Sequence, residues 1–387
     1  MAGRQTAGVP REFWLTLRDI KREETTYGVA SWALWEKMFG ILQYAIDGED
    51  ARRLAIKHIL GAISCSRSCF EVSRICARLS SLVRDSELAE GLLGRAYENA
   101  MSVEDIVLRT RILGDISRNA YMLGLVGLGD RCVSILRSYS ECAADDPVWS
   151  AEVMITMARA LSAVDLDRAD SAFSRAYELA GKVISKYRRA KLLSMLSATY
   201  AEVFSDKEAR KIVGGWLNEC LSLWRDYALD NARFLSMCLP YIICVDKGLG
   251  LAYIDMFLSA LLRRRGWLEY FEAFVREADF AGVGVEILSI LERWLIRLRK
   301  YRRVDSLIFS RALSDIIAAM AIRDPYKACS MMSYAEDIVA SLDADRLEDV
   351  AVILRNIARV DVPLSYVLTS TVAEELVSSG RKRDAIL

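Results

Sequence analysis

The sequence predicts an all-α protein built from antiparallel helical hairpins, and three observations support this prediction. Apolar residues recur at intervals of three and four along nearly the whole chain, as at Leu193, Leu196 and Tyr200, whereas no sustained alternation of β-branched residues appears. Short acidic or glycine-bearing segments interrupt these apolar patterns. A small residue at the start of a helical pattern returns about every 40 residues, a spacing typical of repeats made of two helices.

Length and composition agree with a repeat array. The 387 residues exceed what one compact core accommodates, so the alternatives are several domains or an array of repeats, and the periodicity favours the array. Apolar residues make up 53% of the chain and proline only 5 residues, which leaves little room for a disordered tract. We therefore expect the chain to be folded nearly throughout.

The interruptions between the helical patterns have the composition of helix starts. Aspartate or serine at these places can accept hydrogen bonds from the free N–H groups of the next helix. Pro147 and Pro325 each follow an aspartate, at the position where the first helical residue belongs. The predicted turns lie at residues 48–50, 84–87, 127–130, 165–167, 205–206 and 323–325.

A repeated three-position pattern follows these turns. A small residue is followed by a bulkier apolar residue four positions on and by another packing residue seven positions on, as in Ala169, Phe173 and Ala176. These positions share one face of a helix, and the small residue lets a neighbouring helix approach closely. The small residues are Ala51, Ala89, Cys132, Ala169, Ala209, Ala252 and Ala328, with an unclear position near residue 290.

The pattern resembles that of the tetratricopeptide repeat (TPR) family. The similarity is greatest across one complete hairpin, in Leu193, Leu196, Ser197, Tyr200, Ala209, Val213 and Trp216. It covers roughly residues 50–260 and 304–345, with a period longer than the about 34 residues of that family and without most of its first-helix tryptophan and glycine residues. The resemblance implies a right-handed superhelix of helical hairpins with a ligand-binding concave face, stacked as in TPR or, at this longer period, HEAT proteins.

The two ends of the chain differ from the middle. Residues 1–47 are expected to form an N-terminal arm and aromatic capping helices, and residues 48–363 the array of hairpin repeats. Residues 364–387 are expected to form a C-terminal capping helix and a tail. Aromatic residues at helical spacing, such as Trp32, Trp35 and Phe39, are typical of a packed cap, whereas Trp14 has contact with a partner as its alternative.

Charge and cysteine content restrict the function classes. Lysine plus arginine and aspartate plus glutamate number 52 each, so no overall field attracts nucleic acid or an anionic membrane, and any such affinity must be local. The longest uncharged apolar stretch, residues 234–245, is too short to span a bilayer, and we expect a cytoplasmic protein without a membrane partner. The nine cysteines are expected to be mostly reduced. Scarce Gln, Asn and His beside many charges is typical of a thermophilic source or of a genome that favours Arg and Ala.

No residue pattern of a known catalytic or metal centre occurs in the sequence. GxxxxGK[ST], HExxH, GxSxG and EF-hand patterns are all absent. The single histidine, His58, lies between apolar neighbours, where packing or surface exposure is more common than catalysis. Cys65, Cys69 and Cys76 lack the paired spacing of a zinc site, so packing is favoured over metal binding or redox use. We therefore expect no enzymatic activity, cofactor or bound metal.

The most basic segment is residues 292–303. As a helix it would place its cations on two flanks of a buried stripe, both facing water. Such a helix can hold phosphates or an acidic protein segment, although pairing with acids on neighbouring helices is the more common role. The predicted stripe is Leu291, Trp294, Leu295 and Leu298. The candidate basic patch is Arg293, Arg297 and Lys300 on one flank and Arg299, Arg302 and Arg303 on the other.

Residues 234–262 are the most apolar part of the chain. Buried helices in the middle of the array explain this composition, and a homo-oligomeric interface is the alternative. Pro240 within this segment is expected to bend or interrupt its helix.

These features predict a non-enzymatic scaffold or adaptor that binds a protein or peptide partner on a concave surface. Hairpins locked by close packing would hold polar and aromatic groups at fixed spacing, so the receptor loses little entropy on binding. The alternative is a nucleic-acid-associated helical-repeat protein that uses residues 292–303. Local patterns do not identify the residues of the concave face, because these depend on the curvature of the array.

Overall fold

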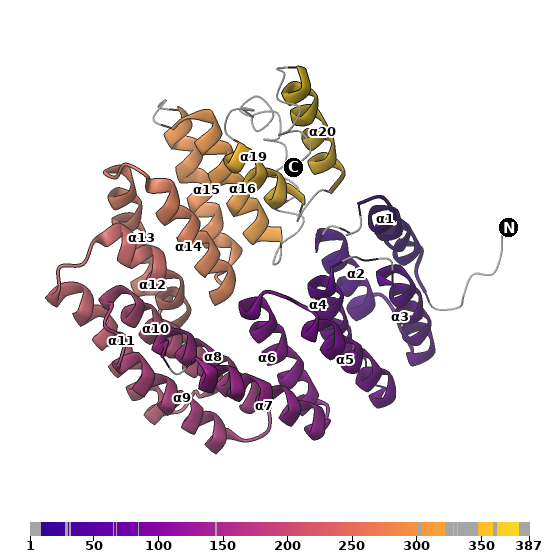
Figure 1. The fold of residues 1–387 in the computed structure, drawn as a ribbon, viewed down its shortest axis with the longest axis horizontal. Coiled ribbons are helices and arrows are strands. Elements are labelled where there is room, and N and C mark those ends of the chain that lie inside the picture. The colour runs from indigo at the N-terminus through magenta and orange to yellow at the C-terminus, as the bar shows by residue number, and fades with distance from the viewer. Residues whose placement is uncertain are drawn as a thin grey trace.

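A computed structural model shows an array of helices wound into an arc (Figure 1). It describes residues 9–27, 30, 32–64, 66, 68–83, 85–143, 145–300, 304–321, 328, 331, 347–358 and 362–378. Over these residues the chain forms 18 α-helices and no β-strand. The prediction of an all-α solenoid is therefore confirmed.

The helices follow one another through short turns. The first nine are α1 (Arg11–Tyr27), α2 (Trp32–Tyr44), α3 (Glu49–Ile63), α4 (Cys69–Ser80), α5 (Ser86–Met101), α6 (Ile106–Met122), α7 (Val126–Cys142), α8 (Pro147–Leu161) and α9 (Leu166–Gly181). The others are α10 (Lys186–Val203), α11 (Lys207–Asp226), α12 (Asn231–Val245), α13 (Lys247–Leu262), α14 (Trp267–Ala281), α15 (Val285–Lys300), α16 (Ser306–Ala321), α19 (Leu347–Ala358) and α20 (Val362–Ser378).

The helices form two layers. Even-numbered helices from α4 to α16, followed by α19, pack successively against one another and make the inner layer of the arc (Figure 1). Odd-numbered helices from α5 to α13 pack mainly against the even-numbered helix that precedes them and make the outer layer. Each such pair is an antiparallel hairpin. The array curves because consecutive inner helices are in closer contact than consecutive outer helices.

The two ends of the arc meet. Helices α1 and α20 contain residue pairs whose Cα atoms lie within 8 Å of each other. Figure 1 shows both helices on the same side of the molecule. The curvature is therefore large enough to bring the first and the last described helices into contact, which the local sequence pattern does not determine.

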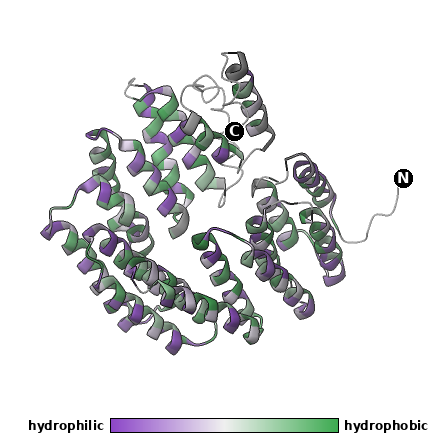
Figure 2. Ribbon diagram, viewed as in Figure 1, coloured by the Kyte–Doolittle hydropathy of each residue, from purple (hydrophilic) through white to green (hydrophobic). Residues whose placement is uncertain are grey.

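Two large clusters of buried apolar residues share the central helix α10. Leu192, Leu196 and Tyr200 belong to the cluster that begins at α1, whereas Ala190 and Leu193 belong to the cluster that continues to α16 and beyond. Figure 2 shows apolar and hydrophilic residues interspersed along the helices of both halves. Helix α10 thus packs against neighbours on two faces, and it connects the two halves of the interior.

The predicted close contacts are present at most of the small residues. Buried positions among them are Ala51, Ala89, Cys132, Ala169, Ala209 and Ala328. Phe173 and Ala176, the partners of Ala169 in the pattern, are also fully buried. Successive hairpins therefore use the same tight helix contact, as predicted.

The prediction for Ala252 is wrong. Ala252 is exposed, and the close contact is made by Gly250, two residues earlier. A Cβ atom on Gly250 would lie 2.8 Å from the Cα of Ile243, so the approach of α12 to α13 leaves no room for a side chain. Ile254 and Phe257, four and seven residues after Gly250, are buried and complete the three-position pattern.

An aspartate caps the start of most helices from α5 to α13, as the turn composition predicts. At α8 the Asp146 carboxylate accepts hydrogen bonds from the backbone N–H groups of Val148 (3.0 Å) and Trp149 (3.2 Å). Pro147 is the first residue of this helix. Pro325, the second proline assigned to a helix start, lies outside the described residues.

The turn predicted at residues 127–130 is wrong. Helix α7 already begins at Val126, and the reversal occurs at Gly124, whose φ of 75° favours glycine. Gly129 lies inside the helix instead. A Cβ atom there would be 2.4 Å from Cε1 of Tyr121, so this glycine permits the close packing of α6 and α7. The glycine-rich segment serves one turn and one helix contact.

The apolar segment 234–262 divides into two helices with different surroundings. Helix α12 is largely buried, whereas α13 exposes 40% of Met256 and 47% of Leu262. Pro240 is buried within α12, which continues through it, so the predicted interruption does not occur.

None of the described helices is long and apolar enough to cross a membrane.

Candidate functional site on the inner face

The inner layer carries a chain of polar contacts, which we call the inner polar belt. Each contact joins helices of the inner layer, which the hydrophobic contacts already hold side by side. The belt comprises Arg118 of α6, Glu152 and Arg159 of α8, Lys191 and Glu202 of α10, Tyr241 of α12, Glu272 and Glu277 of α14, Arg311 of α16 and Asp349 of α19.

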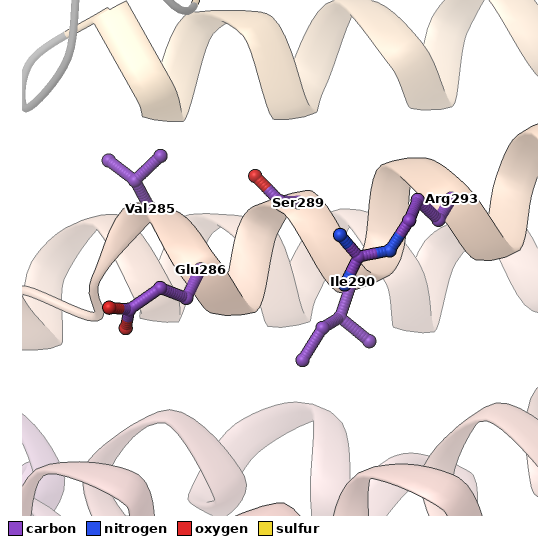
Figure 3. A pocket seen from close by; sticks show the side chains of 5 residues that line it. All are labelled: Val285, Glu286, Ser289, Ile290 and Arg293. Carbon is purple, nitrogen blue, oxygen red and sulfur yellow. The ribbon is translucent and has the colours of Figure 1, made fainter.

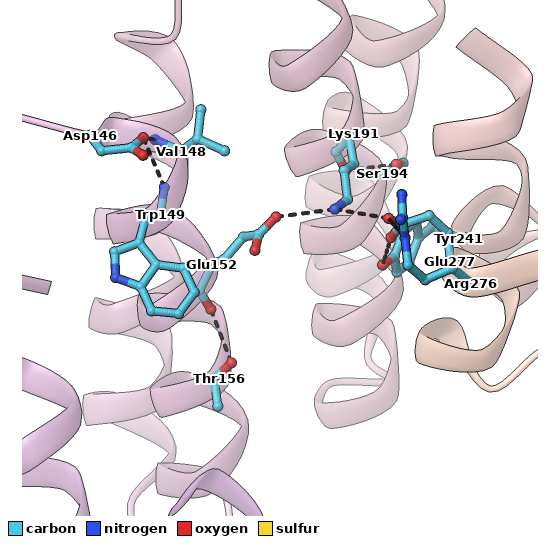
Figure 4. Close-up of polar contacts among 10 residues, drawn as sticks. All are labelled: Asp146, Val148, Trp149, Glu152, Thr156, Lys191, Ser194, Tyr241, Arg276 and Glu277. Atoms are coloured by element: carbon cyan, nitrogen blue, oxygen red, sulfur yellow. Dashed lines mark hydrogen bonds and ion pairs between the residues drawn. The ribbon is translucent and has the colours of Figure 1, made fainter. Parts of the chain in front are cut away.

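Lys191 is the central cation of the belt (Figure 4). Its Nζ lies 3.2 Å from Oε1 of Glu152 and 3.1 Å from Oε1 of Glu277, so one ammonium group connects α8, α10 and α14. Only 17% of the Lys191 side chain and 5% of the Glu277 side chain are exposed. Burial opposes the charge of Lys191, but the two carboxylates outweigh it, and the pKa of Lys191 lies above its usual value.

Tyr241 provides the contribution of α12. Its hydroxyl donates a 2.8 Å hydrogen bond to Oε2 of Glu277, whose other oxygen contacts Lys191 (Figure 4). Burial and the neighbouring Glu277 carboxylate raise the pKa of Tyr241 well above its usual value. Tyr241 therefore stays neutral and serves as a donor, and both oxygens of Glu277 are satisfied.

Glu202 joins the inner helices at a second point. Its Oε1 accepts from Nη1 of Arg118 and from Nη2 of Arg159, each at 3.1 Å, and so links α10 to α6 and α8. Burial alone would raise the pKa of Glu202, but Arg159 and Arg118 outweigh it and lower the pKa. These side chains stay accessible, with 34% of Arg118, 45% of Arg159 and 42% of Glu202 exposed.

Asp115 of α6 lies within the electrostatic field of the same arginines. Asp115 is exposed to solvent, although neighbouring protein atoms partly desolvate its carboxyl group. This desolvation raises the pKa of Asp115 against the opposing effects of Arg159, Arg74 and Arg118. We call Arg74, Asp115, Arg118, Arg159 and Glu202 the inner charged patch.

The belt continues to the last inner helices through Arg311. The guanidinium group of Arg311 pairs with Glu272 of α14 and with Asp349 of α19. Burial lowers the pKa of Arg311, but the two carboxylates outweigh this and raise it. For Glu272 burial prevails over the attraction of Arg311, and its pKa is raised.

The charged groups of the belt are paired with one another. Its carboxylates in α8, α10 and α14 are bound to cations, so none is positioned as a general base with a neighbouring nucleophile. Over the part of the chain that the structure describes, no group of three His, Cys, Asp or Glu side chains is arranged to hold a metal ion. The accessible Arg118, Arg159 and Glu202 of the belt belong, with Arg74 and Asp115, to the inner charged patch, to which four helices contribute.

The sequence-predicted basic patch lies on α15, which packs against α16 and is not one of the inner helices. Arg293, Arg297 and Lys300 are exposed as expected. Arg299 is only half-exposed, because its guanidinium carbon lies 4.7 Å from the centre of the Phe309 ring. Leu291, Leu295 and Leu298 of the predicted stripe are buried and Trp294 is half-buried. Arg302 and Arg303 lie outside the described residues.

A shallow hollow of about 360 Å³ adjoins this patch (Figure 3). Its walls are Val285, Glu286, Ser289, Ile290 and Arg293, all from α15. Glu286 pairs with Lys247 of α13 at 3.2 Å, with both side chains mostly exposed. Because a single helix supplies the lining, the hollow lacks the converging groups of a small-molecule site.

His58, Trp14 and Cys76, which the sequence analysis considered as candidates, are packed against other side chains. His58 lies edge-on to the Trp14 ring at 4.9 Å, and burial, with smaller effects of Lys21 and Lys57, lowers its pKa. This contact joins α1 to α3, and Trp14 is packed there. Cys76 is fully buried, and burial raises the pKa of its thiol to about 12, whereas Cys69 is half-buried and Cys65 lies outside the described residues.

The inner polar belt was not predicted from the sequence. A signal was present, because Glu152 and Lys191 are 39 residues apart and Tyr241 and Glu277 are 36 apart, close to one repeat. Charged residues separated by one repeat on first helices of hairpins are therefore candidates for such contacts. Selecting the correct pairs requires the helical phase of each inner face, which apolar spacing defines only approximately.

Comparison with known proteins yields similarities to solved structures only. No known protein family matches the chain, and no curated protein does. A solved structure described as a circular tandem repeat protein with novel repeat topology and enhanced subunit contact surfaces aligns with 97% of this chain and 93% of its own, at 14% identity and a TM-score of 0.23. The helical-repeat solenoid follows from the arrangement of the described helices themselves.

Proposed function

We propose that the protein is a non-enzymatic scaffold that binds a segment of a protein partner along the inner face of the arc. The observation that carries this proposal is the inner charged patch, in which α4, α6, α8 and α10 each contribute a charged side chain. A surface assembled from consecutive repeats suits an extended segment that crosses several helices.

The charge of the patch indicates the chemistry of the segment. The patch contains three guanidinium groups and two carboxyl groups, so its cations outnumber its anions. Arginine presents a planar fork of donors that matches carboxylates. We therefore expect an acidic segment, held by arginines whose geometry Glu202 has already organised.

Affinity capture from a lysate of the source cells tests this function. The full chain serves as bait beside two variants, Arg118→Ala with Arg159→Ala in the inner patch and Arg293→Ala with Arg297→Ala on α15. A protein captured by the wild type and the α15 variant, but lost by the inner variant at an unchanged melting temperature, supports the proposal. Capture of the same protein by all three chains, or of a small molecule and no protein, contradicts it.

A second candidate function is nucleic-acid association through α15. The specific observation is that Arg293, Arg297 and Lys300 are exposed on one flank of this helix. Binding of single- and double-stranded oligonucleotides should then weaken steeply with salt, and replacing the three cations by alanine should flatten the salt dependence. Absence of binding at low salt eliminates this candidate.

A further inference from the structure

Basic residues gather along one edge of the arc. The turns that follow α9, α11 and α13 each lead from an outer helix to an inner helix, so the alternation of helix direction places them on the same edge. Residues 182–188, 225–233 and 263–270 contain eight lysines and arginines and three acids, a local charge of +5 in a chain with no net charge. We call these three segments the basic edge.

Contacts between the three segments make them continuous. The backbone N–H of Asp230 donates to the Tyr187 hydroxyl at 3.0 Å, which joins the second segment to the first. The guanidinium carbon of Arg233 lies 4.4 Å from the centre of the Tyr187 ring. Arg264 pairs with Asp230 and so joins the third segment to the second. The edge is one surface and not three separate turns.

Aromatic rings hold several of these cations in place. Nζ of Lys186 lies 4.3 Å from the centre of the Tyr227 ring, and the guanidinium carbon of Arg264 lies 5.4 Å from that of Tyr270. Arg225, Arg263 and Arg265 are exposed beside them. The charge is therefore partly ordered before any ligand arrives.

An apolar side chain is exposed in each of the first two segments and, at Leu262, directly before the third. Exposure is 93% for Ile184, 54% for Tyr227 and 47% for Leu262, and each has lysine or arginine within two residues. The opposite edge also exposes apolar residues, such as Leu166 at 52%, but there Asp165 and Asp167 outnumber the neighbouring Arg168. Over the basic edge as a whole, cations outnumber acids by eight to three.

We propose that the basic edge binds the surface of an anionic phospholipid bilayer. Lysine and arginine side chains contact lipid phosphates, and Ile184, Tyr227 and Leu262 enter the boundary between headgroups and acyl chains. A row of turns along one edge matches a flat surface, and no spanning helix is required. Nucleic acid also matches the charge, but it offers no apolar phase for a nearly fully exposed isoleucine.

The neutral net charge of the chain does not exclude binding to an anionic membrane. Electrostatic attraction in physiological salt falls off within about 10 Å, so only the charge near the contact surface matters. Exposed acids occupy the same edge further along, in Glu104, Asp105, Glu141, Asp145 and Asp146. The protein should therefore approach the bilayer tilted, with α9 to α14 nearest the lipid.

Vesicle flotation with the full chain tests this proposal. Vesicles of phosphatidylcholine alone are compared with vesicles in which about a third of the lipid is phosphatidylglycerol, at low and physiological salt. The variant Arg225→Ala/Arg263→Ala/Arg265→Ala is matched with Arg293→Ala/Arg297→Ala/Lys300→Ala on α15. Ile184→Ser is matched with Leu166→Ser on the opposite edge. Unchanged melting temperatures establish that each variant is folded.

We expect binding to the anionic vesicles only. The triple variant of the basic edge should bind about 100-fold more weakly, about fivefold for each cation, and the α15 triple should bind as the wild type. Ile184→Ser should bind about tenfold more weakly, and Leu166→Ser should not differ. The proposal is overturned by absence of binding at low salt, or by equal losses in both triple variants. Binding of a single-stranded oligonucleotide, but not of vesicles, through Arg225, Arg263 and Arg265 also overturns it.

Discussion

The inner and outer layers of the arc differ in how deeply their ion pairs are buried. Inner helices pack successively against one another, and some of their charged groups are largely buried in contact with opposite charges, as in Lys191 between Glu152 and Glu277. Outer helices pack mainly within their own hairpin, and pairs such as Lys247 and Glu286 remain mostly exposed. Desolvation raises the cost of burying a charge and also strengthens the attraction between opposite charges. The buried inner ion pairs should therefore contribute to the free energy of unfolding and to the curvature, whereas the exposed outer ion pairs should contribute little.

The largest expected effect comes from Lys191→Met. This change leaves the Glu152 and Glu277 carboxylates in a largely buried place without their cation, and we expect the free energy of unfolding at pH 7 to fall by about 3–5 kcal/mol. Denaturant unfolding monitored by circular dichroism measures it.

A second variant separates loss of charge balance from loss of packing. Adding Glu152→Gln and Glu277→Gln to Lys191→Met removes the unpaired charges, and most of the lost stability should return. If the triple variant is as unstable as the single one, the ion pairs are not the cause of the effect.

The next effect concerns Glu24 of α1, a buried carboxylate that forms no ion pair with the described residues. It is 2% exposed and accepts a 3.2 Å hydrogen bond from the backbone N–H of Ala30. Burial raises its pKa from 4.5 to about 7. The folded state therefore favours the protonated form of Glu24. Below pH 4.5 the residue does not reduce the free energy of unfolding, and the reduction grows as the pH rises from 4.5 through 7.

Glu24→Gln keeps the hydrogen-bond acceptor and removes this titration. At pH 8 the variant should be more stable than the wild type by about 2–3 kcal/mol, and at pH 4 the two should be equal. Free energies of unfolding measured across this range test the prediction. A constant difference between the two proteins at all pH values would exclude titration of Glu24 as its origin.

A smaller effect is expected where inner helices approach closely. A Cβ atom on Gly114 of α6 would lie 2.5 Å from Cγ2 of Thr156 in α8, and Thr156 is held by a hydrogen bond from its hydroxyl to the backbone oxygen of Glu152. Overpacking should outweigh the better helix propensity of alanine, so Gly114→Ala should lower stability by about 1–2 kcal/mol.

Outer glycines provide the control for this contact. Gly215 of α11 is exposed, and a Cβ atom there would meet no neighbouring side chain or helix within 4 Å, so Gly215→Ala should raise stability by about 0.5–1 kcal/mol. Melting temperatures of both variants, and of Gly114→Ala combined with Thr156→Ser, give the comparison. A gain in both glycine variants would show that the inner contact adapts without cost.

The smallest effect is expected in the outer layer. Lys247 and Glu286 form an ion pair at 3.2 Å, but 63% and 74% of their side chains are exposed. Lys247→Ala should change the free energy of unfolding by less than about 0.5 kcal/mol, and this small loss should vanish in high salt. A loss comparable to that of Lys191→Met would remove the distinction between the two layers.

The sequence predicted correctly those features that depend on the residues of a single helix. Ala169, Phe173 and Ala176 were placed correctly because their pattern lies on one face of a single helix. Gly250 was missed in favour of Ala252 because both residues are small, and only the contact of Gly250 with Ile243 of the preceding helix distinguishes them. The exposure of most of α15's cations was likewise predicted from its own amphipathic pattern.

The contacts of the inner polar belt could not be predicted from the local sequence. Lys191 contacts Glu152 and Glu277, which belong to helices on either side in the chain, and Glu277 lies two hairpins further on. Many other charges occur at similar separations, and nothing in the local sequence distinguishes those that face inward. The contact between α1 and α20 depends on the summed rotation of all the hairpins.

The sequence by itself determined the helices, their caps and the small residues at which hairpins pack, because each of these depends on neighbours within a few turns of one helix. Only the tertiary structure decided which charges are buried together, how far the arc closes and which turns share an edge. These features arise from small rotations between successive hairpins, which add up along the whole array and bring distant residues together.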